Sequence, residues 1–157
     1  MKFPIHSSPH DIIKNLEETL RTLIQNELSS TGPNWWKQRI PDDVKKITRE
    51  RKEKHEKHDE KKLHLINYID FSDYEKIIIR NDNWNDCFSN IFQKKQSIST
   101  ILSELNPIRD SIAHSRNLSR QEIKRLKFYS EEILVYIKNH KKKSQKKIKS
   151  KLKPWLK

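Results

Sequence analysis

The chain has 157 residues, a length that fits one domain built around a single core. Hydrophobic residues make up 32% of it and charged residues 35%, whereas an average globular protein has about 45–50% and about 25%. Cys87 is the only cysteine, which excludes an internal disulfide and a cysteine-based zinc cluster. A monomer has little apolar surface for its core, so we expect a dimer that buries more of it.

The sequence contains no membrane-spanning pattern. No apolar run approaches the roughly 18 residues of a membrane span, and the first ten residues lack the apolar segment of a signal peptide. A lone cysteine is typical of a reducing compartment. We therefore expect a soluble, cytoplasmic protein.

The net charge of +13 is concentrated at one end of the chain. Residues 138–157 hold ten lysines and no acidic residue, so that +13 less these ten charges leaves +3 for residues 1–137. Most of the affinity for polyanions should therefore reside in this lysine-rich tail. We expect the tail to be disordered, or to become helical on binding.

A single glycine makes tight hairpin turns almost unattainable, while apolar residues recur at helical spacing. The pattern predicts an all-α domain over residues 1–137, a bundle of about five helices. The first helix should span Pro9–Leu28, with Ser8 as N-cap and proline at the first position. Its apolar stripe consists of Ile12, Leu16, Leu20, Leu23 and Ile24.

Two adjacent indoles follow the first helix. The simplest role of Trp35 and Trp36 is to cover one end of the bundle, and the alternative is base stacking or partner binding. A long, highly charged helix is expected from Asp42 to Tyr68. His55 and His58 lie three residues apart on it, but the neighbouring lysines oppose a cation, and we expect no metal site and no cofactor.

The second half of the chain is predicted to form short helices followed by two long ones. One short helix is expected to be capped by Ser72 and another to span Asn83–Phe92. A helix from Ser97 to Ser115 should break or bend near Pro107. The last helix begins at Ser119, where Ser-Arg-Gln-Glu forms a capping box.

The segment RDSIAH, residues 109–114, contains the strongest candidates for catalytic residues. With about 100° per residue and Arg109 at zero, Ala113 falls near 40°, Asp110 near 100° and His114 near 140° on a helical wheel. Its apolar residues lie on the opposite, buried side. One exposed face thus presents a cation, a carboxylate and an imidazole, but Arg109 and His114 are too far apart to meet on one helix. Two apposed copies of the face would bring both groups into one cleft.

The motif resembles the R-x(4–6)-H signature of HEPN (higher eukaryotes and prokaryotes nucleotide-binding) domains. The resemblance covers about residues 9–138. It includes the Leu-Asn-Pro-Ile lead-in, the Ser115-Arg116 exit, the capped final helix, and the segment YIDFSDYEKIII with Trp84 and Phe88. It implies a dimeric, HEPN-like helical bundle whose composite cleft cuts single-stranded RNA without a metal.

The resemblance implies a role for each residue of the motif. Arg109 would stabilise charge on the phosphoryl oxygens, and His114 would exchange protons near neutral pH. Asp110 would orient the His114 ring or keep it protonated. The resemblance also suggests a toxin, an antiviral-defence protein or an RNA-processing effector, with an antitoxin or another regulatory partner.

Further RNA contacts are expected beside the motif and in the tail. The candidates beside the motif are Asn106, Ser111 and Arg116, and those in the tail, which would bind phosphates without sequence preference, are Lys141, Lys142, Lys143, Lys146 and Lys147. Two alternatives stay open: a non-catalytic HEPN-like module that binds RNA or a protein, and a simple nucleic-acid binder that uses only its tail. Apolar residues in the tail also leave open a short amphipathic helix on an acidic partner or membrane surface.

Overall fold

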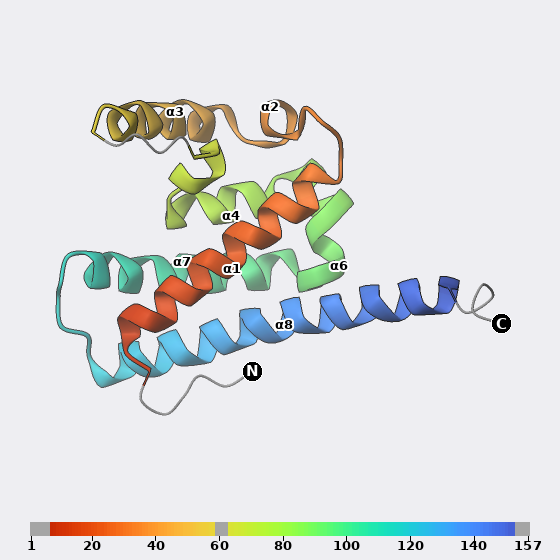
Figure 1. The fold of residues 1–157 in the computed structure, drawn as a ribbon. Helices are drawn as coiled ribbons and strands as arrows, with labels where there is room; N and C mark the ends of the chain where they lie inside the picture. The colour runs from red at the N-terminus through yellow and green to blue at the C-terminus, as the bar shows by residue number, and fades with distance from the viewer. Residues whose placement is uncertain (1–6, 59–62, 153–157) are drawn as a thin grey trace.

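The computed structural model of the chain describes residues 7–58 and 63–152. Every regular element among these residues is helical, which confirms the all-α class (Figure 1). The elements, in chain order, are α1 (Pro9–Ser29), α2 (Trp35–Arg39), α3 (Asp42–Glu56), the 3₁₀ helix η1 (Leu65–Tyr68), α4 (Phe71–Ile79), α5 (Asn81–Asn83), the π-helix η2 (Trp84–Phe88), α6 (Ser89–Phe92), α7 (Lys95–Ala113) and α8 (Arg120–Leu152).

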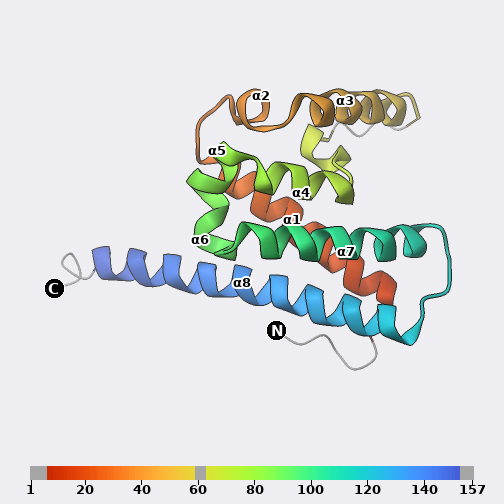
Figure 2. The same ribbon diagram turned by 180° about the vertical axis from the view of Figure 1, so that it is seen from behind.

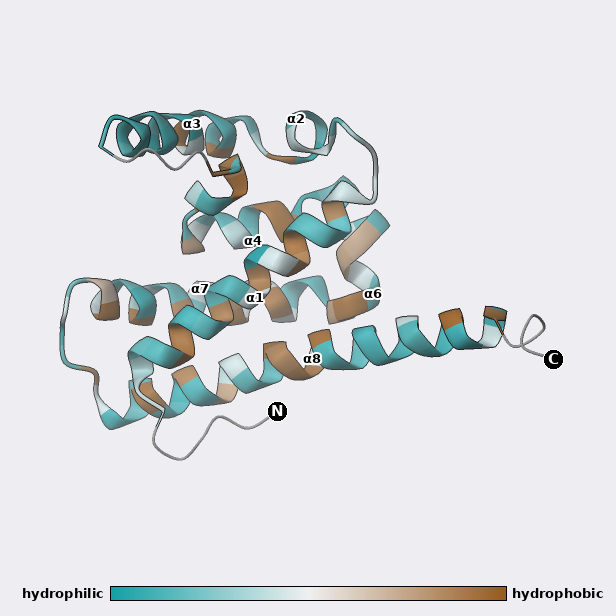
Figure 3. Ribbon diagram, viewed as in Figure 1, coloured by the Kyte–Doolittle hydropathy of each residue, from teal (hydrophilic) through white to brown (hydrophobic). Residues whose placement is uncertain are grey.

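The helices form a bundle in which α1 crosses α4 and α7 obliquely, with α8 along one side and the α2–α3 pair along the other (Figures 1 and 2). α4 packs on α7, α8 packs on α1, α6 and α7, and α3 packs on η1. The core between them is aliphatic and aromatic; its largest fully buried side chains include Tyr74, Phe88, Phe92, Ile12, Leu16 and Leu20. Hydrophilic residues predominate on α3 and on the distal half of α8, with single hydrophobic residues among them (Figure 3).

The two capping predictions at the ends of the bundle are confirmed. Ser8 is the N-cap of α1, and its Oγ accepts a hydrogen bond from the Asp11 amide at 3.2 Å. In the capping box of α8, the Glu122 amide donates to Ser119 Oγ and the Ser119 amide to Glu122 Oε1, both at 3.1 Å. Both caps depend on hydrogen bonds between residues three apart in the sequence, so they form independently of how the helices pack.

The long helix expected over residues 42–68 is wrong, because α3 ends at Glu56 and a separate turn, η1, begins at Leu65. Residues 59–62 of the expected helix lie outside the described residues. Charged residues are compatible with a helix but do not determine where it ends. The chain turns back at η1, which places Ile66 in the core.

The expected short helices also differ in detail. The N-cap of α4 is Asp70 rather than Ser72, which lies inside the helix; the Asp70 amide donates to the Asp73 carboxylate at 3.1 Å. The expected helix over Asn83–Phe92 is divided into α5, the π-helix η2 and α6. α7 runs through Pro107 without a break, since the proline lies on the exposed side, where the carbonyl left unpaired can face solvent.

The lysine-rich segment continues α8. Residues 138–152 are helical, so disorder is not what the structure shows for this part of the tail, and residues 153–157 lie outside the described chain. The division of the chain at residue 137 stays a prediction. Among the described helices, none has both the length and the apolar character needed to cross a bilayer.

Candidate nuclease site at the end of α7

Arg109 lies near the end of α7 and points its guanidinium group towards α1 and α4. Its Nε donates to Glu17 Oε1 at 2.9 Å, its Nη2 lies 3.0 Å from Asp70 Oδ1, and its Nη1 lies 3.6 Å from Asp110 Oδ1. The Arg109 side chain is 26% exposed. Contacts from three elements therefore fix the plane of the guanidinium group.

The carboxylates set the charge state of Arg109. Burial alone would lower the pKa of the guanidinium group, but the hydrogen bond with Glu17 and the charges of Asp70, Glu17 and Asp110 outweigh it and raise the pKa above its ordinary value. These interactions consequently favour the charged form of Arg109. A permanently charged, oriented fork is suited to bind phosphoryl oxygens.

His114 is the C-cap residue of α7, and its side chain is exposed. Its backbone amide donates to the Asp110 carbonyl at 3.0 Å, and the next residue, Ser115, takes the left-handed conformation (φ 53°) that turns the chain away. Among the described residues, no hydrogen bond or ion pair joins the His114 ring to Arg109 or Asp110. Within the described part of one chain, the two side chains of the motif are therefore not in contact.

The position of Asp110 differs from the expected contact with His114. The structure places its carboxylate against Arg109 instead, and the side chain is 51% exposed. The backbone explains this difference: His114 falls where α7 ends, so its side chain leaves the helical path that the wheel assumes.

Two adjacent hollows flank the motif where the start of α1 meets the end of α7. The first, the Arg109 hollow, has a volume of about 170 Å³ and is lined by His10, Ile13, Lys14, Glu17, Arg109, Ile112 and Ala113. The second, the Arg116 hollow, measures about 320 Å³ and is lined by Ser8, Pro9, His10, Ile112, Ser115, Arg116, Asn117, Leu118 and Ile123. His10 borders both, so the two hollows form one continuous surface around the motif.

Sequence reasoning missed the contributions of α1 and α4 to this site. His10, Lys14 and Glu17 recur at helical spacing beside the buried stripe of α1, which is a visible signal. That signal does not identify which helix they face, since Glu17 and Arg109 are 92 residues apart. Asp70 could be suspected only as a helix cap.

The RNA-contact candidates beside the motif are distributed unevenly. Arg116 lines the Arg116 hollow, and its amide donates to the Ser111 carbonyl at 2.8 Å. Asn106 and Ser111 are half-buried on α7. Of the three, the structure brings Arg116 closest to the groups of α1.

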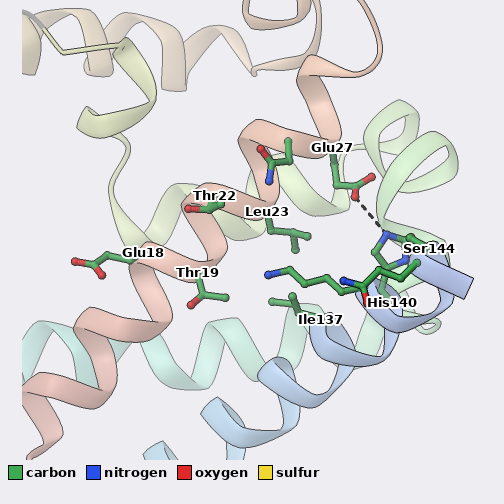
Figure 4. A pocket seen from close by; sticks show the side chains of 11 residues that line it. Glu18, Thr19, Thr22, Leu23, Glu27, Ile137, His140 and Ser144 are labelled. Carbon is green, nitrogen blue, oxygen red and sulfur yellow. Dashed lines mark hydrogen bonds and ion pairs between the residues drawn. The ribbon is translucent and has the colours of Figure 1, made fainter. Parts of the chain in front are cut away.

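The tail lysines lie far from the motif along α8. Ile123 lines the Arg116 hollow, and Lys141 comes 18 residues later on the same helix, or roughly 27 Å along its axis at 1.5 Å per residue. Lys141 lines a groove of about 500 Å³ between α1 and α8, where His140 Nε2 lies 3.3 Å from Glu27 Oε1 (Figure 4).

The remaining tail lysines do not share that groove. Lys142, Lys143 and Lys146 line a hollow beside α6, on another side of α8, and Lys147 is fully exposed. Although the groove in Figure 4 is larger than the Arg109 hollow, it lacks both Arg109 and His114. Arg109 lies instead at the α1–α7 junction, and His114 lies at the adjacent end of α7.

No group of three or more potential metal ligands occurs within residues 7–58 and 63–152. His55, one of the two histidines considered for a metal, lies 2.7 Å from the Tyr68 hydroxyl through its Nδ1. The structure thus gives this histidine a partner within the bundle.

Comparison with known proteins identifies one match. A family model described as Swt1-like HEPN matches residues 12–138, most of the chain. No curated protein and no solved structure matches significantly. The matched range contains α4, α7 and all of α1 from Ile12 onward, the three helical elements that position Arg109.

Proposed function

The chain belongs to the Swt1-like HEPN family, and on that premise we propose that it is a metal-independent endoribonuclease. HEPN domains are generally nucleases or have other RNA-related functions. The observation that carries the proposal is the guanidinium group of Arg109, which carboxylates from three elements orient and keep charged in a hollow. His114, the other residue of the motif, is exposed at the C-terminal end of the same helix. The proposed substrate is single-stranded RNA.

The proposed reaction needs only groups of the protein and the RNA. The ribose 2′-hydroxyl attacks the adjacent phosphorus, the P–O5′ bond breaks, and the products are a 2′,3′-cyclic phosphate and a free 5′-hydroxyl. Arg109 stabilises the negative charge on the phosphoryl oxygens, and His114 transfers to the leaving 5′-oxygen the proton that the 2′-hydroxyl loses. Acid–base action of this kind contributes roughly 10²–10⁴-fold to the rate.

The contacts of Arg109 leave donors for a phosphate. Glu17 engages Nε and Asp70 engages Nη2, whereas Nη1 faces only the more exposed Asp110 at 3.6 Å, beyond hydrogen-bond distance. A phosphoryl oxygen can therefore replace Asp110 at Nη1 without breaking the two shorter contacts. His10 and Lys14 add positive or neutral donors at the edge of the same hollow.

A homodimer completes the proposed site. In one chain His114 does not contact Arg109, so a phosphate held by Arg109 needs a proton-transfer group from elsewhere. Apposition of two α7 ends across a two-fold axis would supply each Arg109 with the His114 of the other copy. A strictly monomeric protein that still cleaves RNA would contradict this part of the proposal.

The test is RNA cleavage in the presence of EDTA by the purified full-length protein. We expect cleavage that leaves a 2′,3′-cyclic phosphate or its hydrolysis product, and its loss in the Arg109→Ala/His114→Ala double variant. The matched control is Arg125→Ala/His58→Ala, which removes the same residue types from exposed positions on α8 and beyond α3. Undiminished cleavage by the Arg109/His114 variant would refute the assignment.

A second variant separates chemistry from folding. Because Arg109→Ala leaves Glu17 and Asp70 without their partner, that variant can lose stability as well as activity. Arg109→Lys keeps the positive charge but loses the planar fork, so we expect a folded protein whose cleavage rate falls at least tenfold. Circular dichroism and thermal melting check the fold of each variant.

A non-catalytic HEPN module is the second candidate. It is favoured by the carboxylates that engage Arg109, and by the lack, among the described residues, of a contact between Arg109 and His114. It predicts RNA or protein binding without cleavage in the EDTA assay. For the cleaving protein, we propose a cytoplasmic toxin, an antiviral-defence protein or an RNA-processing effector, held in check by an antitoxin or another regulatory partner. Growth arrest on expression in bacteria, dependent on Arg109 and His114, tests the toxin role.

A further inference from the structure

A second basic surface lies on the opposite side of the bundle from α8, in the layer formed by α2, α3 and η1 (Figure 1). A groove of about 620 Å³ runs through it, here called the Trp36 groove, and is lined by Trp36, Lys37, Asp42, Lys45, Lys46, Arg49 and Leu65. None of these residues lines the Arg109 or Arg116 hollow. The groove is therefore a separate surface from the proposed nuclease site.

The Trp36 groove has a clear excess of positive charge. Its one acidic residue, Asp42, pairs with Lys45 at 2.9 Å, and the Lys45 ammonium also donates to the Lys37 carbonyl at 2.9 Å. Within the described part of the chain, no ion pair or hydrogen bond engages the side chains of Lys37, Lys46 and Arg49, and all three are exposed. Three uncompensated cations thus border one groove.

The sequence of α3 explains why these cations gather. With Asp42 at zero on a helical wheel, Lys45, Lys46 and Arg49 fall within about 60° of it, and the buried Val44 and Thr48 fall near 200–240°. The buried residues fix the rotation of the helix. The basic residues of its first two turns consequently face the groove.

Trp36 supplies an oriented aromatic surface in the groove. Its ring meets Trp35 edge-to-face at 5.7 Å and His64 edge-to-face at 5.7 Å, while Trp35 is buried and stacks on His64. Trp35 therefore belongs to the core, whereas Trp36 is half-buried and packs against it. A ring held by two neighbours loses little conformational freedom when a ligand stacks on it.

We infer that the Trp36 groove binds a segment of single-stranded RNA, with Lys37, Lys46 and Arg49 on its phosphates and a base stacked on Trp36. Proteins that bind single strands without sequence preference combine two features: cations along the path of the phosphate backbone, and aromatic side chains on which bases stack. The inference rests on the RNA-related half of the proposed function and not on cleavage. It makes the groove a second contact for the strand that the nuclease site cuts.

The test is the affinity of the full-length protein for a fluorescent 2′-O-methyl oligouridine, which lacks the attacking hydroxyl and stays intact. We expect Lys46→Gln/Arg49→Gln to weaken binding at least tenfold and to lower the slope of log affinity against log salt by about 1.4, or about 0.7 per lost phosphate contact. The matched control is Lys54→Gln/Lys57→Gln, which removes two lysines with the same spacing from the distal end of α3, outside the groove.

Trp36 is tested separately. Trp36→Leu should weaken binding about 5- to 100-fold, the contribution of one stacked base, and Trp36→Phe should restore most of it. Equal thermal melting of wild type and variants shows that the changes act on binding. Affinity that is unchanged in the groove variants, reduced equally in the control pair, or absent in the wild type overturns the inference.

The two proposals fail in different measurements. Normal cleavage in EDTA by a protein whose groove variants bind RNA like wild type refutes the groove alone. Groove-dependent binding by a protein that does not cleave refutes the nuclease alone.

Discussion

Arg109 shows how one residue of the site depends on others far along the chain. Its two shortest contacts come from Glu17 on α1 and Asp70 at the start of α4, both of which are partly buried. In the proposed reaction both carboxylates act through Arg109, so we regard both as positioning residues. Their effect on cleavage should appear in the rate rather than in RNA affinity.

Glu17→Gln tests this role, because it keeps the shape of the side chain and removes its charge. Loss of a charged hydrogen bond, worth about 1.5–3 kcal/mol, should lower kcat about tenfold or more with little change in KM. Glu18→Gln is the matched control, since Glu18 is the exposed neighbour and faces the α1–α8 groove instead. Equal kcat values for Glu17→Gln and wild type would show that Arg109 is held adequately by Asp70.

His64 gives the fold a pH dependence. Burial, followed by the nearby charge of Lys52, lowers the pKa of His64 below its ordinary value of 6.5, and its Nδ1 accepts a hydrogen bond from the Ile66 amide at 3.1 Å. The folded state favours the neutral ring, while the unfolded chain takes up the proton at a higher pH. This contribution to stability is therefore complete above about pH 6.5 and is lost as the pH falls below it.

We expect the free energy of unfolding to decrease between about pH 7 and pH 5 in the wild type, and to decrease less in His64→Asn. Asparagine removes the titrating group and can still cap η1. Urea denaturation at a series of pH values measures the difference. His58→Asn, at an exposed position, should follow the wild type, and an identical pH profile for His64→Asn would contradict the assignment.

At the scale of the elements, a buried amide joins the α2–α3 segment to the core. Asn83 is fully buried, and its Nδ2 donates to the carbonyls of Arg39 and Ile77, both at 2.8 Å. Asn83 lies in α5, directly before the π-helix η2. The side chain thus ties the end of α2 to the end of α4.

Asn83→Ala should lower the free energy of unfolding by about 2–4 kcal/mol, because it leaves two carbonyls without their donor. Chemical denaturation followed by circular dichroism measures this change. Asn85→Ala, at an exposed position two residues later, should change stability by less than about 0.5 kcal/mol. Similar values for the two variants would show that water replaces the lost donor.

The elements that the sequence predicts well are those defined by neighbouring residues. Ser8 and Ser119 cap their helices through hydrogen bonds that span three residues, and the stripe of α1 is buried as its spacing requires. The end of α3 and the cap of α4 depend instead on where Ile66 and Asp70 meet the rest of the bundle. The contacts of Arg109 are equally nonlocal, so the motif predicts which residues matter but not what holds them.

At the scale of the whole molecule, basic residues line three separate surfaces: the proposed nuclease site, the Trp36 groove and the distal part of α8. Residues 147–152 of α8 are all exposed, beyond the last contacts with α1 and α6. They can be removed without uncovering the core. The RNA binding that we propose for them can thus be tested separately from folding.

Deletion of residues 147–157 should raise KM for a long single-stranded RNA and weaken its salt dependence, while kcat at saturating RNA stays unchanged. Cleavage rates across RNA and salt concentrations measure both quantities. A deletion variant that binds no RNA at all would instead support the simple tail-dependent binder, and an unchanged KM would remove the tail from the RNA path.

Because α8 is one continuous helix, it holds the Arg116 hollow and the tail lysines at a fixed separation. Ile123, beside the Arg116 hollow, and Lys147 are separated by 24 residues of one helix, or roughly 36 Å. An RNA too short to span that length can bind at the proposed nuclease site or at the tail lysines, but not at both at once. The tail therefore adds nothing to the affinity of the nuclease site for such an RNA. The benefit of the tail should accordingly begin at a threshold of RNA length, which helix geometry sets and base sequence does not.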